Sequence, residues 1–304
     1  MKRKILGLLG GWLVSAFCLA ENHALLIGVR QVASAYPSPI LESISNDLVL
    51  AKQMASRLGV PETHIRVLSD AGQGRLPTRS NVTESMRTLA AQVSPGDFVL
   101  LYLSGHGVQQ PSLIPQGGDP LDEIFLLADS QRWAAGKGIA NALSDKEIRN
   151  WLAALDSKQV KVWLVADTCH ASGLMRGAQD WLDDEIAISG FKGLRSSWLG
   201  MKTWLQKGKP GTGSQNASRL KTGALPNVAA FMAADENSSA LEIELKRDGR
   251  KVGLFTWALA QALKQMHGPI PPEKLAQATL ALYRRYPQWV ARPVFEAGEL
   301  SGAP

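Results

Sequence analysis

The chain has 304 residues, of which 45% are hydrophobic and 20% charged, and its formal net charge is +6. This composition excludes a disordered or collagen-like protein and supplies enough apolar residues for a sizeable core. Lys2, Arg3 and Lys4 carry three of the positive charges. The remaining excess is spread through a loop instead of forming a basic stripe, which argues against nucleic-acid binding.

The N-terminus has the pattern of a secretory leader. Three basic residues precede an apolar run over 5–14, and small residues follow up to Ala20. We expect a signal peptide, 1–20, cleaved after Ala20, and a periplasmic or secreted protein. The alternative is a membrane anchor, but the apolar run is shorter than the roughly 20 residues that span a bilayer. Cys18 leaves with the leader, so the mature chain keeps only Cys169 and forms no internal disulfide.

Buried strands and amphipathic helices alternate along the mature chain. Apolar runs predict the strands, and apolar residues at helical spacing predict the helices. Gly59 ends the first helix, Asn81 with Glu84 resembles a capping arrangement for the second, and Ser144 with Glu147 forms a capping box for the third. The expected strands are 23–29, 65–68, 97–103, 123–128, 161–166 and 228–233, and the expected helices are 47–58, 81–93, 148–155, 255–263 and 273–286.

This alternation predicts one α/β domain with a mostly parallel central sheet. The stretch 174–226 has no clear periodicity and is rich in glycine, proline and serine. A loop of this length is usually functional or disordered. We therefore expect a flexible segment inserted in a single domain over 21–304.

Two chemically suggestive motifs end neighbouring strands. His106 follows the strand 97–103, and Cys169 follows the strand 161–166. In open parallel sheets the ligand crevice lies at the carboxyl ends of the strands, so both residues are expected there. A cysteine attacks a carbonyl as the thiolate and needs a base, which imidazole can be at neutral pH. The alternatives are a buried structural cysteine, a structural histidine, and His170 as the base, although adjacent side chains usually diverge.

The motifs Ser104-Gly105-His106-Gly107 and Asp167-Thr168-Cys169-His170 resemble those of the caspase superfamily, and in particular its metacaspase and bacterial members. The resemblance begins at His23, passes through Asn46-Asp47, and reaches Gly253-Leu254-Phe255-Thr256-Trp257. It implies a caspase-like three-layer α/β/α sandwich, peptidase C14. It also implies a large-subunit-like part, 21–173, a linker, 174–226, and a small-subunit-like part, 227–304.

The resemblance further implies a Cys169/His106 dyad and a substrate pocket formed by Asp47, Ser104 and Asp167. Two carboxylates in one pocket favour a cationic side chain, so we expect cleavage after Arg or Lys. Asp47 is alternatively a helix N-terminal acid, and Asp167 an ordinary loop-capping residue. The amides of Gly105 and Cys169 are the expected oxyanion hole.

Three further expectations concern regulation and partners. Basic residues after Cys169 are candidate self-cleavage sites, or alternatively a solvated basic loop: Lys192, Arg195, Lys202, Lys207, Lys209, Arg219 and Lys221. Some metacaspases need calcium, and Asp119, Asp122, Glu123 and Asp145 lie in comparable regions. Arg176 stands where the family often has another acid, so the metal site is incomplete; we predict no cofactor, and calcium is the alternative. Metacaspases are usually monomers, and a monomer is expected here.

The sequence thus predicts an exported cysteine endopeptidase that acts on proteins or peptides with basic residues through a thioester intermediate. Two other functions remain open. A catalytically silent scaffold is disfavoured by the retained thiol and imidazole. A transpeptidase would share the thioester step and differ only in the acceptor.

Overall fold

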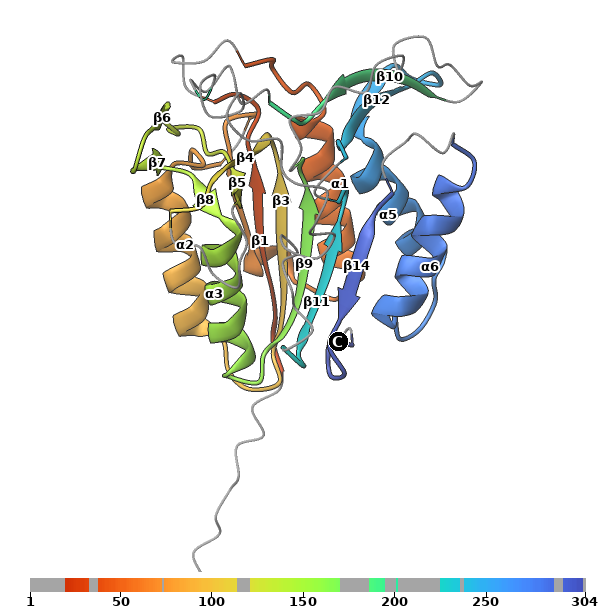
Figure 1. Cartoon of the computed structure of the whole chain (residues 1–304). Helices are drawn as coiled ribbons and strands as arrows, with labels where there is room; N and C mark the ends of the chain where they lie inside the picture. The colour runs from red at the N-terminus through yellow and green to blue at the C-terminus, as the bar shows by residue number, and fades with distance from the viewer. Residues whose placement is uncertain are drawn as a thin grey trace, which may run out of the picture.

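A computed structural model describes residues 20–32, 38–72, 74–113, 121–169, 186–194, 201, 225–235, 238–286 and 292–302 (Figure 1). Its central sheet has six strands in the order β14-β11-β9-β3-β1-β2. Neighbours pair in parallel except β14 (Val294–Ala297), which is antiparallel to β11. The parallel strands are β1 (Asn22–Gly28), β2 (Ile65–Ser69), β3 (Phe98–Ser104), β9 (Lys161–Asp167) and β11 (Val228–Met232). The predicted α/β class with a mostly parallel sheet is confirmed.

Helices cover both faces of this sheet (Figure 1). One face packs against α1 (Ile44–Arg57), α5 (Leu254–Gln265) and α6 (Pro272–Tyr283), and the other against α2 (Arg79–Gln92) and α3 (Asp145–Asp156). Successive strand residues point to opposite faces, so Leu26 packs in the first core and Leu25 and Ile27 in the second. Burial on both faces explains why these strands are almost continuously apolar.

The helix ends agree only in part with the capping patterns. Ser144 caps α3, because its hydroxyl accepts the N–H of Glu147 at 3.2 Å. Gly59 follows α1 with a left-handed φ of 75°, as a stop signal requires. The expected Asn81–Glu84 cap is wrong, since Thr78 caps α2 by accepting the N–H of Asn81 at 3.3 Å. Asn81 therefore lies inside the helix.

Smaller sheets stand at the carboxyl edge of the central sheet, where β10 and β12 lie at the top of Figure 1. One contains β10 (Ile186–Phe191), β12 (Leu241–Leu245) and β13 (Arg250–Gly253), all antiparallel. The sequence predicts no regular structure in the stretch 174–226. This is wrong for residues 186–191, which form β10. The other elements are β4 (Gly107–Pro111), β5 (Leu121–Phe125), β6 (Trp133–Ala134), β7 (Gly138–Ile139), β8 (Leu143–Ser144) and the 3₁₀ helix η1 (Glu62–His64).

The expected leader, 1–20, lies outside the described residues except for Ala20. Within the ranges given above, no helix has the length and apolarity needed to cross a bilayer.

Candidate active site

The two candidate catalytic residues lie at the same edge of the sheet. Strands β3 and β9 pair in parallel, with Ser104 opposite Asp167. His106 lies two residues after Ser104, and Cys169 lies two residues after Asp167. The register of β3 and β9 therefore brings both residues to the carboxyl edge of the sheet. Both side chains are fully buried. The structure thus places the predicted nucleophile and the predicted base at the same edge of the sheet.

Backbone carbonyls hold both ring nitrogens of His106. Nε2 lies 2.8 Å from the Pro39 oxygen, and Nδ1 lies 3.0 Å from the Lys192 oxygen. A carbonyl oxygen only accepts hydrogen bonds, so both bonds form when the imidazole carries a proton on each nitrogen. In the neutral ring with the proton on Nε2, Nδ1 is unprotonated and donates no bond to the Lys192 carbonyl. Burial lowers the pKa of His106, and the two carbonyls partly offset this by raising it. Pro39 therefore favours the tautomer in which Nδ1 is the base.

The Cys169 thiol contacts the backbone of Ala240, the residue that directly precedes β12. Its Sγ accepts the N–H of Ala240 at 2.6 Å and lies 3.6 Å from the oxygen of the same residue. Burial raises the pKa of Cys169 to about 12, although hydrogen bonds from Ser239 and Ala240 act in the opposite direction. The thiol is thus protonated at neutral pH in this arrangement. In the described part of the chain it does not hydrogen-bond to His106.

The two glycines that flank His106 have different roles. Gly105 N–H donates to the Asp167 oxygen at 3.4 Å, which directs this amide at the neighbouring strand. Gly107 N–H donates to the Lys192 oxygen at 3.2 Å. A Cβ at Gly107 would lie 1.7 Å from the Cys169 oxygen, so the chain here tolerates only glycine. The amide that contacts the Lys192 carbonyl beside the candidate base is thus that of Gly107, and not that of Gly105, the residue expected from the sequence.

The three residues of the expected substrate pocket do meet, and a lysine fills the space between them. Lys192 Nζ lies 2.9 Å from Asp47 Oδ2, 2.8 Å from Asp167 Oδ2 and 2.9 Å from Ser104 Oγ. The side chains of Lys192 and both aspartates are completely inaccessible to solvent. The pocket is therefore closed to solvent, acidic and occupied by an ammonium group.

Residues of β13 and α5, together with the N-cap residue of α1, orient the two carboxylates. Asp47 Oδ1 accepts the Gly253 N–H at 2.7 Å, and its Oδ2 accepts the Ser43 hydroxyl at 2.9 Å. Asp167 Oδ2 accepts the Thr256 hydroxyl at 2.6 Å. A Cβ at Gly253 would lie 2.0 Å from Asp167 Oδ2, so this position must remain a glycine.

Gly253 and Thr256 are pocket residues to which the sequence analysis assigned no role. Both belong to the segment 253–257, which carried the resemblance, and that membership was the only available signal.

Electrostatics keep the ammonium charged in this dry pocket. Burial lowers the pKa of Lys192, but Asp167 and Asp47 outweigh it, and the net pKa lies above the ordinary value. Burial raises the pKa of Asp167, although Lys192 lowers it. Asp167 Oδ1 is also buried, with no hydrogen-bond partner among the described residues. The carboxylates of Asp47 and Asp167 face a single ammonium, that of Lys192, so the pocket favours a cationic over a neutral side chain.

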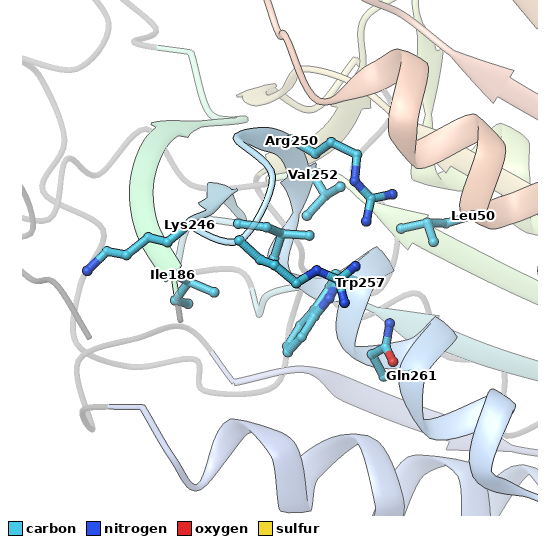
Figure 2. A pocket seen from close by; sticks show the side chains of 9 residues that line it. Leu50, Ile186, Lys246, Arg250, Val252, Trp257 and Gln261 are labelled. Atoms are coloured by element: carbon cyan, nitrogen blue, oxygen red, sulfur yellow. The ribbon is translucent and has the colours of Figure 1, made fainter. Parts of the chain in front are cut away.

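A separate groove of about 480 Å³ lies beside β10, β12 and α5 (Figure 2). Its charged lining residues are all basic, so it cannot select a cationic side chain. Ile186, the first residue of β10, contributes to its wall, which places the groove at the far end of β10 from Lys192. The lining residues are Leu50, Ile186, Leu245, Lys246, Arg247, Arg250, Val252, Trp257 and Gln261.

The region compared with a calcium site already contains a cation from the protein. Lys146 Nζ lies 2.5 Å from Asp122 Oδ1. Asp145 Oδ1 accepts the Glu123 N–H at 3.3 Å, and burial raises the pKa of Asp145 to about 6. The remaining predicted residues lie outside the described part of the chain: Asp119, His170, Arg176, Arg195, Lys202, Lys207, Lys209, Arg219 and Lys221.

A buried thiol and an imidazole at the carboxyl edge of a parallel sheet, beside an acidic pocket, form an arrangement that suits the chemistry of a cysteine peptidase. The family model of the caspase domain, peptidase C14, matches residues 21–291. The chain therefore belongs to the caspase domain family of cysteine peptidases, as the motifs predicted.

Among characterised proteins, the chain is similar to metacaspases. Metacaspase-1B of Aspergillus fumigatus is 22% identical over 269 residues, which cover 82% of this chain and 63% of the relative. Metacaspase-6 of Arabidopsis thaliana is 25% identical over 166 residues, covering 54% of this chain and 41% of the relative. The chain thus spans about three fifths or less of the length of these relatives.

The fold is also found in a solved structure. Protein GSU0716 of Geobacter sulfurreducens superposes with a TM-score of 0.61 at 20% sequence identity. The match covers 91% of this chain and 94% of that one. At this identity the likeness concerns the fold alone.

Proposed function

We propose that this protein is an exported cysteine endopeptidase that cleaves peptide bonds after lysine or arginine. The observation that carries the proposal is the buried ammonium of Lys192 between Asp47, Asp167 and Ser104. A pocket that already holds one lysine side chain has the length, charge and hydrogen-bond acceptors for a lysine or arginine of a substrate. An aspartate side chain would meet two carboxylates and be repelled.

In the proposed reaction, Cys169 is the nucleophile and His106 Nδ1 accepts its proton. The thiolate attacks the carbonyl carbon of the basic residue, and the Gly107 amide stabilises the oxyanion, with the Cys169 amide as the predicted second donor. His106 then protonates the leaving amine, and water hydrolyses the thioester. The Pro39 carbonyl positions the imidazole through Nε2 and contacts no reacting atom.

A pair of fluorogenic peptides that differ only in ending in lysine or aspartate tests the proposal. We expect Cys169-dependent release after lysine alone, with a Cys169→Ala variant as control. Release after aspartate would contradict the acidic pocket. Addition of a primary amine separates hydrolysis from transfer, because a transpeptidase would yield the amide of that amine instead of the free acid.

A further inference from the structure

A second cluster of titratable side chains lies at the amino edge of the central sheet, opposite the candidate active site. Strands β1 and β2 pair in parallel, with Ala24 opposite Ile65. His23 and His64 directly precede these two residues, so the register of the strands brings the two imidazoles together. Their rings stack with centroids 4.7 Å apart and 5° between their planes.

His23 occupies a position at which the strand pattern predicts an apolar residue. Side chains alternate along a strand, so His23 points to the same face as Leu25 and Ile27, which pack in the core against α2 and α3. The His23 side chain is only 9% exposed. Its Nε2 is buried and has no hydrogen-bond partner in the part of the chain that the structure describes. Buried polar atoms normally have a partner, so this nitrogen points to a missing ligand.

Glu21 places a carboxylate oxygen beside both imidazoles. Its Oε2 lies 3.7 Å from His23 Nε2 and 4.0 Å from His64 Nδ1. One ligand atom from each of the three residues lies within 4.8 Å of the other two. An ion with bonds of about 2.0–2.2 Å to nitrogen and oxygen holds tetrahedral ligands roughly 3.3–3.6 Å apart, so a small closure is enough. The side chains of Glu21 and His64 are 61% and 31% exposed and can make this approach.

The cluster opens into a cavity of about 400 Å³, whose wall also includes Arg66. This space admits a water as a fourth ligand. The negative charges of Glu21 and Asp97 act on His23 against the positive charges of Arg66 and of a protonated His64. The Asp97 carboxylate already accepts two backbone N–H groups, at 2.8 and 2.7 Å, so it contributes charge to the site and not a bond.

We propose that Glu21, His23 and His64 form a zinc site that a water completes. Two imidazoles and one carboxylate are a ligand set that zinc favours, whereas calcium takes six to eight oxygen ligands. His64 Nδ1 also lies 3.2 Å from the Asn22 oxygen, so binding through this nitrogen exchanges one long hydrogen bond for a metal bond. The alternative is a stacked histidine pair that packs without an ion.

The ion would join two segments that are distant in the sequence. Glu21 directly precedes β1, and His64 is the last residue of η1, directly before β2. A ligand that binds the folded chain and not the unfolded one stabilises the fold. At a free zinc concentration 100 times the Kd, we expect Tm to rise by about 5 °C for a chain of this size.

The test is a calorimetric zinc titration of the metal-free chain, together with its thermal unfolding. The chain carries Cys169→Ala, so that the thiol cannot bind zinc. We expect one zinc per chain and the rise in Tm. His64→Gln and Glu21→Gln should each weaken binding at least about tenfold and remove most of that rise. His267→Gln is the matched control, because it removes an exposed histidine outside the cluster and should bind zinc like its parent.

A third variant separates a zinc site from a packed histidine pair. His23→Phe keeps an aromatic ring against His64 but removes the buried nitrogen, so zinc should no longer raise Tm. Absence of zinc binding by the parent, or binding by His23→Phe or Glu21→Gln as tight as that of the parent, would overturn the inference. Glu21 is largely exposed, so its variant remains informative if His23→Phe fails to fold. None of these measurements uses a peptide substrate, and their outcome is independent of the proposed function.

Discussion

Replacement of Asp167 by asparagine should weaken the recognition of lysine peptides while leaving the fold intact. The asparagine side chain would keep an oxygen toward Thr256 Oγ1, which lies 2.6 Å from Asp167 Oδ2. Its amide nitrogen would take the place of Asp167 Oδ1, which has no partner among the described residues. The substitution therefore removes a charge and loses few hydrogen bonds.

The size of the effect follows from the pocket contacts. Loss of one partner of a buried, hydrogen-bonded charge pair costs about 2–5 kcal/mol. A bound ammonium would keep Asp47 and Ser104, both at 2.9 Å, so we expect the lower end of this range, about 2–3 kcal/mol. At 1.36 kcal/mol for each factor of ten, kcat/KM for a lysine peptide falls by about 30- to 160-fold.

The assay compares Asp167→Asn with its parent in a Lys192→Ala background, so that only the added peptide can enter the pocket. A peptide with a neutral residue in place of lysine should lose much less, and Asp248→Asn, on the β12–β13 hairpin, should lose nothing. An equal loss for the lysine and neutral peptides would refute the charge argument. The rate of Cys169 alkylation, measured in both variants, shows whether the thiol is disturbed.

Four other predictions follow from the site. Gly107→Ala should lower kcat at least about 100-fold, because its Cβ would lie 1.7 Å from the Cys169 oxygen, whereas Gly105→Ala, whose nearest contact would be 3.0 Å, should lose less. Thr256→Val removes the hydroxyl that positions Asp167 and should raise KM for lysine peptides about tenfold without changing that for neutral ones. Activity should be equal with calcium and with a chelator, since Lys146 already neutralises Asp122; loss in the chelator would contradict this. Alkylation of Cys169 should rise about tenfold per pH unit from pH 7 to 10, because the pKa of this thiol is about 12.

The raised pKa of Cys169 also makes the free energy of unfolding depend on pH. The folded thiol stays protonated up to a pKa of about 12, whereas the unfolded thiol ionises near 9.0. The folded state therefore binds more protons between these values, and the free energy of unfolding falls as the pH rises through this range. Cys169→Ala should remove this part of the pH dependence in denaturant titrations.

Local patterns were sufficient to predict the fold class and the sheet edge at which His106 and Cys169 lie. Strands buried on both faces are continuously apolar, and the helices between them carry one apolar face, so both types of element are visible in a single sequence. His106 and Cys169 directly follow such strands, and parallel pairing then brings them to one edge. Short strands such as β10 carry a weaker signal, because only one of its six residues is buried and no continuous apolar run marks it.

The sequence by itself therefore determined the α/β class, the position of the thiol and imidazole, and the acidic residues beside them. The tertiary structure decided that the Gly107 amide contacts the Lys192 carbonyl, that Thr256 orients Asp167, and that Lys192 fills the pocket. These depend on contacts between residues 86, 89 and 145 positions apart, such as His106 with Lys192, Asp167 with Thr256, and Lys192 with Asp47. No local pattern encodes such pairs, because they form only when the sheet brings its strand ends together.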